Sequence, residues 1–400
     1  TRMPELRGIG VNTVRTWGTD GTTQPLLDAA AQNGIKVING FWLQPGGGPG
    51  SGGCVDYVTD TNYRNTMLGE IQRWVTAYRD HPGVLMWNVG NESILGMQNC
   101  FSGAQVEQER VAYTQFVDQA AQAIHAIDAN HPVTSTDAWT GSWPYYKAYA
   151  PHLDLMAVNS YAQVCKVKQD WIAGGYTKPY IITETGPPGE WEVPNDANGV
   201  PTDPTDIQKR DGYVNAWNCV LNHPGVALGA TLFHYGTEGD FGGIWFNITT
   251  GNEKRLSYYA VRKLYSGRTD GDTPPVIRSM SLSRTTDVPA GGTFTLTADV
   301  SDPDGDPITY TMGYNSKPIN NAGGLISAPF TYNGNGVFTV TAPTTLLGVW
   351  KIYLYARDGH GNVGIEGRSL KVIAPTPPGT NVARGATTTA SSYQAVGDGA

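Results

Sequence analysis

Short apolar runs alternate with longer helical patterns from the start of the chain to about residue 268. The runs are apolar on successive residues, as is typical of strands that are covered on both faces. Between them, apolar residues recur at intervals of three and four, which predicts helices over residues 62–79 and 105–128. An alternation of strands and helices predicts a parallel sheet. The seven predicted strands are residues 11–17, 35–42, 84–89, 132–139, 153–161, 179–186 and 226–236.

The pattern predicts that this parallel sheet closes as a TIM (β/α)8 barrel. A doubly wound open sheet would normally carry a glycine-rich phosphate loop after its first strand, and none is present. Residues 46–53, GGGPGSGG, are not followed directly by a helix, and we interpret them as a flexible surface excursion. Closure requires eight strands, one more than the seven runs. Because residues 1–10 resemble the end of a helix that leads into the second strand, we expect strand one to precede Thr1 and the chain to be a fragment.

The hydrophobic period changes to two beyond residue 275. Residues 269–275, TDGDTPP, have the composition of a linker that ends the barrel domain of residues 1–268. Residues 276–374 predict an immunoglobulin-like β-sandwich, in which inward and outward residues alternate between turn clusters. Residues 375–380 form a second linker, and residues 381–400 are too few to bury a core. The clearest alternating strands are residues 294–300, 337–343 and 350–358.

Composition excludes several classes of partner. Charged residues make up only 16% of the chain, whereas Gly (50), Pro (26), Tyr (21) and Trp (11) are abundant, which favours a loop-rich extracellular protein. The net charge of -8, without a basic cluster, argues against nucleic acid or an anionic membrane as a partner. No apolar run reaches the ~18 residues of a membrane span. We expect a secreted monomer that uses no cofactor and no metal.

The four cysteines are widely spaced and include no CxxC pair, which argues against a zinc cluster or a redox motif. An even number is typical of disulfides. Cys54 and Cys100 each lie in a glycine-rich or polar loop after a strand-like run, and we favour pairing them, which leaves Cys165 with Cys219. Four free thiols remain the alternative, because pairing cannot be deduced from sequence.

Candidate functional residues follow the predicted strands, because barrel enzymes act at the carboxyl ends of their strands. Glu92 and Glu184 stand out, since each directly follows an apolar strand, where burial without a partner would be costly. The complete set of strand-end candidates is Arg15, Trp17, Trp42, Asn91, Glu92, Asp137, Trp139, Asn159, Tyr161, Glu184, His234 and Tyr235.

The segments WNVGNES (87–93) and ITETG (182–186) resemble the acid/base and nucleophile motifs of clan A glycoside hydrolases, which are retaining barrel enzymes. That clan places its proton donor after strand four, preceded by Asn, and its nucleophile after strand seven. With strand one before Thr1, Glu92 follows strand four and Glu184 follows strand seven. The resemblance implies that the chain hydrolyses a β-linked glycan, with Glu92 as acid/base, Glu184 as nucleophile and a carbohydrate as partner.

Retaining hydrolysis explains why two carboxyls are needed. One attacks the anomeric carbon and the other protonates the leaving oxygen from roughly 5 Å away. Glu184 must be ionised, which Arg15 and a hydrogen bond from Tyr161 would favour. Glu92 must be protonated, which the charge of Glu184 would favour. Asn91 is suited to bind the sugar 2-hydroxyl.

Further residues complete the predicted substrate site. The indole rings of Trp17, Trp42, Trp139 and Trp245 either belong to the core or stack on the CH face of a sugar. His234 stands where the clan carries a strand-eight Trp, so the floor of the sugar subsite departs from the pattern, and a structural role is equally consistent. The predicted substrate-binding set is Arg15, Trp17, Trp42, Asn91, Trp139, Tyr161 and His234. We interpret Asp137, Glu190, Glu192, Glu238 and Asp240 as solvated loop residues or contacts to distal sugars.

Two later segments have their own resemblances. Residues 301–310, SDPDGDPITY, look like an EF-hand loop at first but lack its glycine and its terminal glutamate at the required positions. They resemble turns of extracellular immunoglobulin-like and PKD-like domains, which favours a solvated turn over a weak calcium site. Residues 381–394 resemble the first strand of discoidin-type (coagulation factor 5/8 type C) domains, which often bind carbohydrate.

Two other functions use the same residues. A transglycosylase would transfer the same covalent intermediate to a sugar instead of water. A non-catalytic carbohydrate-binding protein on a degenerate barrel is the alternative outside the enzymes, for which the His234 departure is the only indication. The sequence does not select the sugar, the linkage, or internal over terminal attack.

Overall fold

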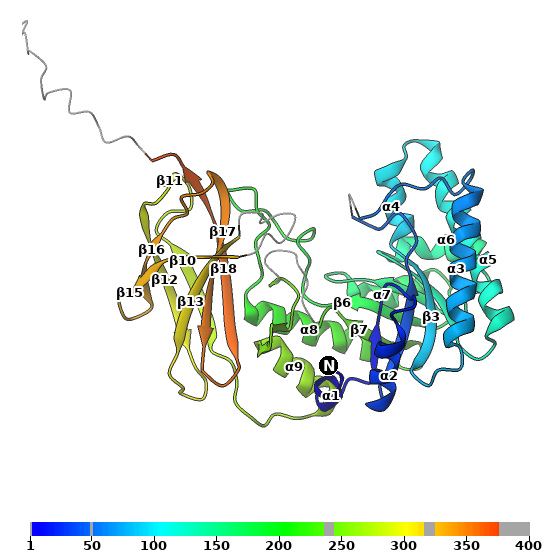
Figure 1. The fold of residues 1–400 in the computed structure, drawn as a ribbon, viewed down its shortest axis with the longest axis horizontal. Helices are drawn as coiled ribbons and strands as arrows, with labels where there is room; N and C mark the ends of the chain where they lie inside the picture. Colours follow the sequence, from blue (N-terminus) through cyan, green and yellow to red (C-terminus); the bar gives the residue numbers. More distant parts are fainter. Residues whose placement is uncertain (1, 49–50, 236–243, 316–324, 376–400) are drawn as a thin grey trace, which may run out of the picture.

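The computed structural model describes residues 2–48, 51–235, 244–315 and 325–375. Its first part is a nearly closed barrel of seven parallel strands in the order of the sequence (Figure 1). Most of these strands are buried on both faces, as their uninterrupted apolar runs predict. The strands are β1 Thr13–Arg15, β2 Lys36–Phe41, β3 Val84–Asn91, β4 Val133–Asp137, β5 Met156–Asn159, β6 Tyr180–Thr185 and β7 Ala227–Leu232.

Helices connect and cover the strands, as expected for a parallel barrel. Local signals set several of their ends: the Asp60 side chain accepts a hydrogen bond from the Tyr63 N–H at the start of α3, and Thr205 and Gln208 form a capping box at the start of α8. None of the helices among the described residues combines the length and apolar character that a membrane crossing requires. The helices are α1 Met3–Gly8, α2 Gln24–Gln32, α3 Thr61–Tyr78, α4 Ser93–Cys100, α5 Ala104–Ile127, α6 Trp143–Tyr149, α7 Val167–Ala173, α8 Asp206–Leu221 and α9 Leu256–Ser266, with single 3-10 turns η1 Thr140–Ser142 and η2 Val164–Lys166.

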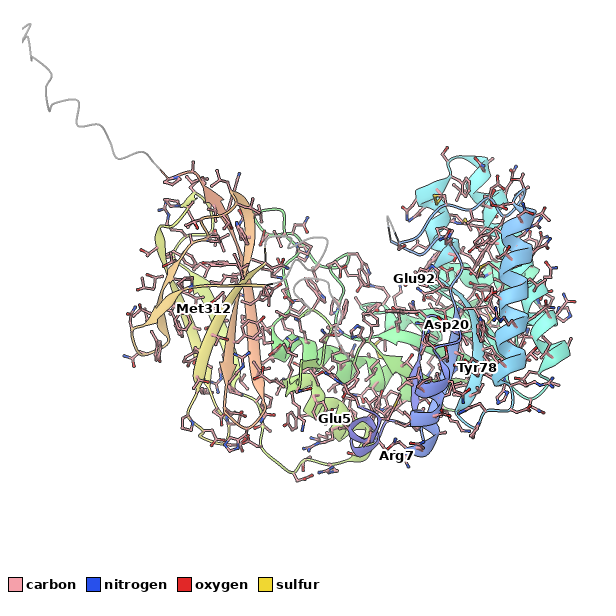
Figure 2. All side chains as sticks on the ribbon, viewed as in Figure 1. Glu5, Arg7, Asp20, Tyr78, Glu92 and Met312 are labelled. Carbon is pink, nitrogen blue, oxygen red and sulfur yellow. A yellow bond between two sulfur atoms is a disulfide. The ribbon has the colours of Figure 1, made fainter. Side chains whose placement is uncertain are left out.

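The barrel has two distinct ends. Figure 2 shows Glu92 towards one end, while Glu5 and Arg7 of α1 lie towards the other. Since α1 precedes β1, and Glu92 directly follows the last residue of β3, Glu92 belongs to the end where the strands finish. This is the end at which barrel enzymes hold their reacting groups.

The second part of the chain contains two β-sheets with a common apolar core around Leu296, Phe338 and Ile352. A small hairpin, β8 Thr249–Thr250 with β9 Glu253–Lys254, precedes them. One sheet has the order β10 Val276–Leu282, β12 Thr293–Ser301, β16 Val337–Thr341, β15 Phe330–Tyr332. The other has the order β11 Val288–Pro289, β18 Val363–Ile373, β17 Gly348–Arg357, β13 Thr309–Asn315, β14 Ile326–Ser327.

Strand burial in these sheets follows the predicted period of two only in part. β12 and β16 alternate between buried and less buried residues, as predicted. β17 is instead buried on nearly every residue from Trp350 to Ala356. One face of β17 joins the sandwich core, and the other packs with Ile244 from the barrel side, so the expected outward face is covered. The discoidin-like residues 381–400 and the linker residues 376–380 lie outside the described part.

Ionic contacts and a hydrogen bond join the barrel to the sheet that contains β17 and β18. Asp206, at the start of α8, is bound by Arg255 through one carboxylate oxygen and by the Ile365 backbone N–H through the other at 2.9 Å. Asp203 contacts Lys209 at 2.8 Å and Lys351 of β17 at 3.1 Å. Figure 1 shows α8 between the barrel and the two sheets. These buried charges therefore join the two parts of the chain.

Candidate active site

A cluster of polar side chains gathers around Glu184 at the carboxyl end of the barrel. Arg15, the last residue of β1, contacts Glu184 Oε1 through Nη1 at 2.8 Å, and the two side chains are only 5% and 9% exposed. The Trp17 Nε1–H donates to the same oxygen at 3.1 Å. The Tyr161 hydroxyl donates to Oε2 at 2.8 Å. One cation and two further hydrogen-bond donors thus surround this carboxyl.

Hydrogen bonds connect Glu184 to Glu92. Arg15 also donates through Nη2 to Asn91 Oδ1 at 2.7 Å. Asn159, the last residue of β5, donates through Nδ2 to Asn91 Oδ1 at 3.1 Å and to Glu92 Oε1 at 2.8 Å. The structure therefore brings Arg15, Asn91, Tyr161 and both glutamates into one network, although they come from four different strands and their following loops.

Glu92 occupies the sharp turn between β3 and α4. Its backbone is left-handed, with φ 60° and ψ 21°, a conformation that is uncommon for residues other than glycine. Asp137, the last residue of β4, accepts hydrogen bonds from the N–H groups of Ile94 at 2.8 Å and Leu95 at 3.2 Å. It thereby fixes the start of α4 directly beside Glu92.

The interpretation of Asp137 as a solvated loop residue is wrong. Its exposure is 0%, and burial raises its pKa to about 6 although backbone donors act against the shift. The helix N-terminus supplies the hydrogen bonds that its position in the sequence did not indicate. Glu192 accepts hydrogen bonds from the N–H groups of Ala162 and Gly189, so it holds two loops together. Glu238 and Asp240 lie outside the described residues.

Burial and a neighbouring charge act on the protonation of Glu92. Burial is the largest cause that raises the pKa of Glu92 to about 8, and the negative charge of Glu184 is the second. The hydrogen bond from Asn159 acts in the opposite direction but is smaller. The expectation that Glu184 would raise this pKa gave the right direction, but withdrawal from water contributes more than the neighbouring charge.

A cavity of about 530 Å³ lies between β1 and β7, the two edge strands of the seven-stranded sheet. Arg15, Trp17, Glu184 and His234 are among the residues that line it, together with apolar residues such as Leu6. The ring of His234 packs against Phe233, with ring centroids 4.3 Å apart. The structure therefore places His234 beside the cavity that reaches Glu184.

The predicted tryptophans fall into three environments. Trp17 is 46% exposed and contacts Glu184. Trp42 and Trp139 are half-buried, and the Trp139 ring lies 5.7 Å from the Arg110 guanidinium. Trp245 does not line a cleft, because it is 1% exposed and lies beside Lys209 and Lys351 between the barrel and the second sheet.

Three residues at the site were not assigned a role from the sequence. Asn159 was recognised only as a strand end, and its bond to Glu92 depends on the convergence of β3 and β5. Trp191 is 60% exposed, and its ring lies 5.2 Å from that of Tyr161. Gly47 packs directly on Glu92. The position of Trp191 in the loop after β6, which carries Glu184, was the one usable signal.

Both predicted disulfides are confirmed. Cys54 is bonded to Cys100 and Cys165 to Cys219. The first pair joins the loop after β2 to the end of α4, and the second joins η2 to α8.

One group of side chains in the described residues has the composition of a metal site. Potential ligand atoms of Asp272, Asp306 and His360 lie within 4.8 Å of one another, in the segments before β10, between β12 and β13, and between β17 and β18. Within the SDPDGDPITY turn, Asp302 accepts hydrogen bonds from the N–H groups of Asp304 and Asp306, as a solvated turn would. Clustered surface carboxyls form without a cation, so we assign no metal here.

The parallel barrel and the paired carboxyls at the ends of its strands are the features of barrel glycoside hydrolases. Residues 5–226, more than half of the chain, match the model of glycosyl hydrolases family 2, TIM barrel domain, and the chain belongs to that family. A curated relative, mannan endo-1,4-beta-mannosidase F of Aspergillus clavatus, is 27% identical over 158 residues, which cover 35% of this chain and 34% of the relative.

Solved structures show the same fold. The β-glucuronidase of Bacteroides uniformis matches 94% of this chain and 43% of its own, with a TM-score of 0.50 and 12% identity. The Bacteroides uniformis β-glucuronidase 2, covalently bound to cyclophellitol-6-carboxylate aziridine, matches 93% of this chain and 43% of its own, with a TM-score of 0.51 and 12% identity. The chain thus spans less than half the length of these proteins.

Proposed function

We propose that this chain is a retaining glycoside hydrolase that cleaves a β-glycosidic bond by double displacement. Glu184 is the nucleophile and Glu92 the acid/base. The observation that carries the proposal is the difference between their surroundings: Arg15 at 2.8 Å, Trp17 and Tyr161 all bind Glu184, whereas a neutral amide binds Glu92. An ionised and a protonated carboxyl are the two groups that retaining hydrolysis needs.

The reaction follows from these charges. The Glu184 carboxylate attacks the anomeric carbon while the glycosidic C–O bond breaks, and the proton of Glu92 passes to the leaving oxygen. The resulting ester has no negative charge, which lowers the affinity of Glu92 for a proton. Glu92 then takes a proton from the attacking water, and Glu184 leaves as a carboxylate.

Asn91 and the tryptophans would orient the sugar. Arg15 and Asn159 both donate to Asn91 Oδ1, so the Asn91 side chain presents its Nδ2 group to a 2-hydroxyl. Trp17 and Trp191 are both exposed and offer flat apolar surfaces to a sugar ring. Trp17 donates a hydrogen bond to one carboxylate oxygen of Glu184, and Trp191 packs on Tyr161, which donates to the other oxygen. Trp42, Trp139 and His234 remain proposed contacts.

The substrate we propose to test first is β-1,4-mannan, because the curated relative is described as a mannan endo-1,4-beta-mannosidase. Both disulfides are compatible with a secreted protein, which suits a polysaccharide substrate. We retain residues 1–268 as the proposed catalytic domain, residues 276–374 as an immunoglobulin-like domain, and residues 381–400 as the start of a discoidin-like domain.

The decisive experiment replaces the nucleophile. Glu184→Gln should lower reducing-end release by about ten thousandfold, because loss of a nucleophile removes the covalent route. The assay uses β-mannan, β-glucan, β-galactan and an aryl β-glucuronide as substrates. Glu70→Gln, at an exposed position on α3, is the matched control and should keep full activity. A Glu184→Gln protein that is folded by circular dichroism and as active as wild type would refute the proposal.

A further inference from the structure

The segment Gln44–Gly47, after β2, is not part of a surface excursion. The sequence predicted flexible surface for residues 46–53, yet Gly46 and Gly47 are buried. Their missing side chains allow the backbone to pack closely, which composition alone cannot distinguish from a flexible loop. Residues 49 and 50 of the predicted excursion lie outside the described part.

Gly47 lies directly on the side chain of Glu92. A methyl group on Gly47 would lie 2.7 Å from Glu92 Cβ and still closer to Glu92 Oε2, both well inside van der Waals contact. By contrast, among the described residues a methyl group on the adjacent Gly48 would meet no atom nearer than Ser51 Oγ at 4.0 Å. Neither glycine has a positive φ, so alanine is compatible with the backbone at both positions. Only contact distinguishes the two residues.

The segment runs along α4, the helix that begins directly after Glu92. The Ser93 hydroxyl donates to the Leu43 carbonyl at 3.1 Å, and Asn99 Nδ2 donates to the Gly47 carbonyl at 3.2 Å. A methyl group on Gly96 would collide with the Gly46 carbonyl. Contacts at the start, middle and end of α4 therefore hold this segment in register with Glu92.

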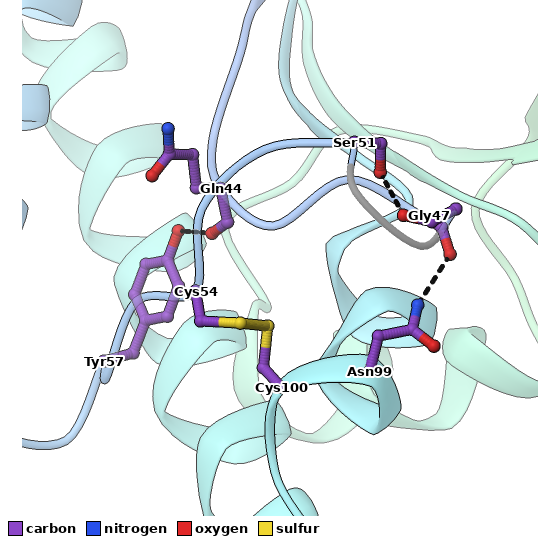
Figure 3. The surroundings of a disulfide bond; sticks show 8 residues. Gln44, Gly47, Ser51, Cys54, Tyr57, Asn99 and Cys100 are labelled. Carbon is purple, nitrogen blue, oxygen red and sulfur yellow. Dashed lines mark hydrogen bonds between the residues drawn. A yellow bond between two sulfur atoms is a disulfide. The ribbon is translucent and has the colours of Figure 1, made fainter. Parts of the chain in front are cut away.

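A covalent bond holds the same pair of elements together. Cys54, downstream of the segment, is bonded to Cys100, the last residue of α4 (Figure 3). Gln44, the first residue of the segment, is also fixed. Its N–H donates to the Tyr63 hydroxyl at 2.9 Å, and its carbonyl accepts from the Tyr57 hydroxyl. The segment is thus anchored on both sides of the point where it covers Glu92.

We propose that Gln44–Gly47 positions the acid/base: Gly47 fixes the carboxyl of Glu92, and the Cys54–Cys100 disulfide keeps the segment against α4. This inference rests on the proposed function, since it assigns a role to the surroundings of Glu92. Gly47 is a positioning residue, because it acts only through Glu92. Covering the carboxyl also withdraws it from water, which is the largest cause of the raised pKa of Glu92.

The test compares Gly47→Ala with Gly48→Ala. Gly47→Ala should lower kcat/KM on the polysaccharide about ten- to a hundredfold, within the range that general acid catalysis supplies. A second substrate is an aryl glycoside of the same sugar with a dinitrophenolate leaving group, which departs without a proton. On this substrate the rate of the first step in Gly47→Ala should fall by less than about threefold. The alkaline limb of the polysaccharide pH profile should move to lower pH. Gly48→Ala should match wild type in all three measurements.

Equal losses on both substrates in Gly47→Ala would overturn the proposal, because they would indicate a general structural defect. So would activity equal to that of Gly48→Ala. If Gly47→Ala does not fold, the double variant Cys54→Ala/Cys100→Ala decides, with Cys165→Ala/Cys219→Ala as control. The first double variant should show the same leaving-group selectivity and the control should not, and equal behaviour of the two would overturn the proposal. Active Glu92→Gln and Glu184→Gln variants would instead refute the proposed function itself.

Discussion

Glu92 and Asp203 are both carboxyl side chains withdrawn from water, and the structure gives them opposite surroundings. Glu92 receives a hydrogen bond from the neutral Asn159, and burial raises its pKa to about 8. Burial would also raise the pKa of Asp203, but the charges of Lys209 and Lys351 lower it to about 2. The partner therefore decides which form of a buried carboxyl is stable.

The two surroundings give the two carboxyls different roles: Asp203 holds two parts of the chain together, whereas Glu92 can exchange a proton. Asp203 with two lysines has no proton to exchange near neutral pH and serves to join the barrel to the second sheet. Glu92 can give up and regain a proton within the range in which enzymes work. Glu184, with Arg15 beside it, resembles Asp203 in having a close cation, but it lies at an open cavity where a substrate can reach it.

Removing Arg15 should have the largest effect on this comparison. Arg15 holds the Glu184 carboxyl through a charged hydrogen bond at 2.8 Å, and removing one preorganised donor at a reacting group costs about a hundred- to a thousandfold in rate. Arg15→Met should therefore lower kcat/KM by about that factor, measured by reducing-end release at constant pH. Arg15→Lys keeps the charge but loses the forked guanidinium that contacts both Glu184 and Asn91. Its kcat/KM should therefore lie between those of wild type and Arg15→Met. Wild-type activity in Arg15→Met would show that Glu184 does not depend on its cation.

Removing one charge from the buried cluster of Asp203, Lys209 and Lys351 should affect stability instead of catalysis. Asp203→Asn removes the carboxylate charge that Lys209 and Lys351 both contact in a buried position, and it should lower the free energy of unfolding by about 3–5 kcal/mol in a urea titration. kcat of the remaining folded protein should be unchanged. Asp270→Asn, which removes an exposed partner of Arg268, is the control and should leave the free energy of unfolding essentially unchanged. A similar, small effect of both substitutions would contradict the role given to Asp203.

The sequence predicted the barrel well because its signals are local. Apolar runs and helical periods lie within single elements, and all seven predicted strands overlap those of the structure. The β17 strand was misjudged because its outer face is covered by residues far away in the chain, such as Ile244. Periodicity within one strand cannot register what another segment covers.

The candidate site was predictable only where a residue lies at or next to the carboxyl end of its strand. Glu92, Glu184 and Arg15 could be found in this way, and the structure brings them together. Asp137 was also found as a strand end, but its role and that of Gly47 could not be predicted, because they depend on contacts with a helix start and a side chain that no local pattern encodes. In the sequence, a glycine that is buried against another residue cannot be distinguished from a glycine in a flexible linker.

A further expected effect concerns how the stability of the protein depends on the protonation of Glu92. The folded-state pKa of Glu92 lies near 8 and its ordinary value is 4.5, so between these values the unfolded chain releases a proton that the folded protein retains. Stability contributed by this group is therefore fully present below about pH 4.5 and is lost as pH rises towards 8. Glu92→Gln removes the titration, and it should raise Tm by about 5 °C at pH 8 while leaving Tm unchanged at pH 4.

Asp203 provides the opposite sign for comparison, because its folded-state pKa lies below its ordinary value of 3.8. Its contribution is present above pH 3.8 and is lost as pH falls towards 2. Scanning calorimetry of wild type and Glu92→Gln between pH 4 and pH 8 measures the first effect, with Glu70→Gln as an exposed control. A Tm difference between wild type and Glu92→Gln that is constant across this range would mean that Glu92 titrates alike in the folded and unfolded protein, so that its surroundings do not hold the proton.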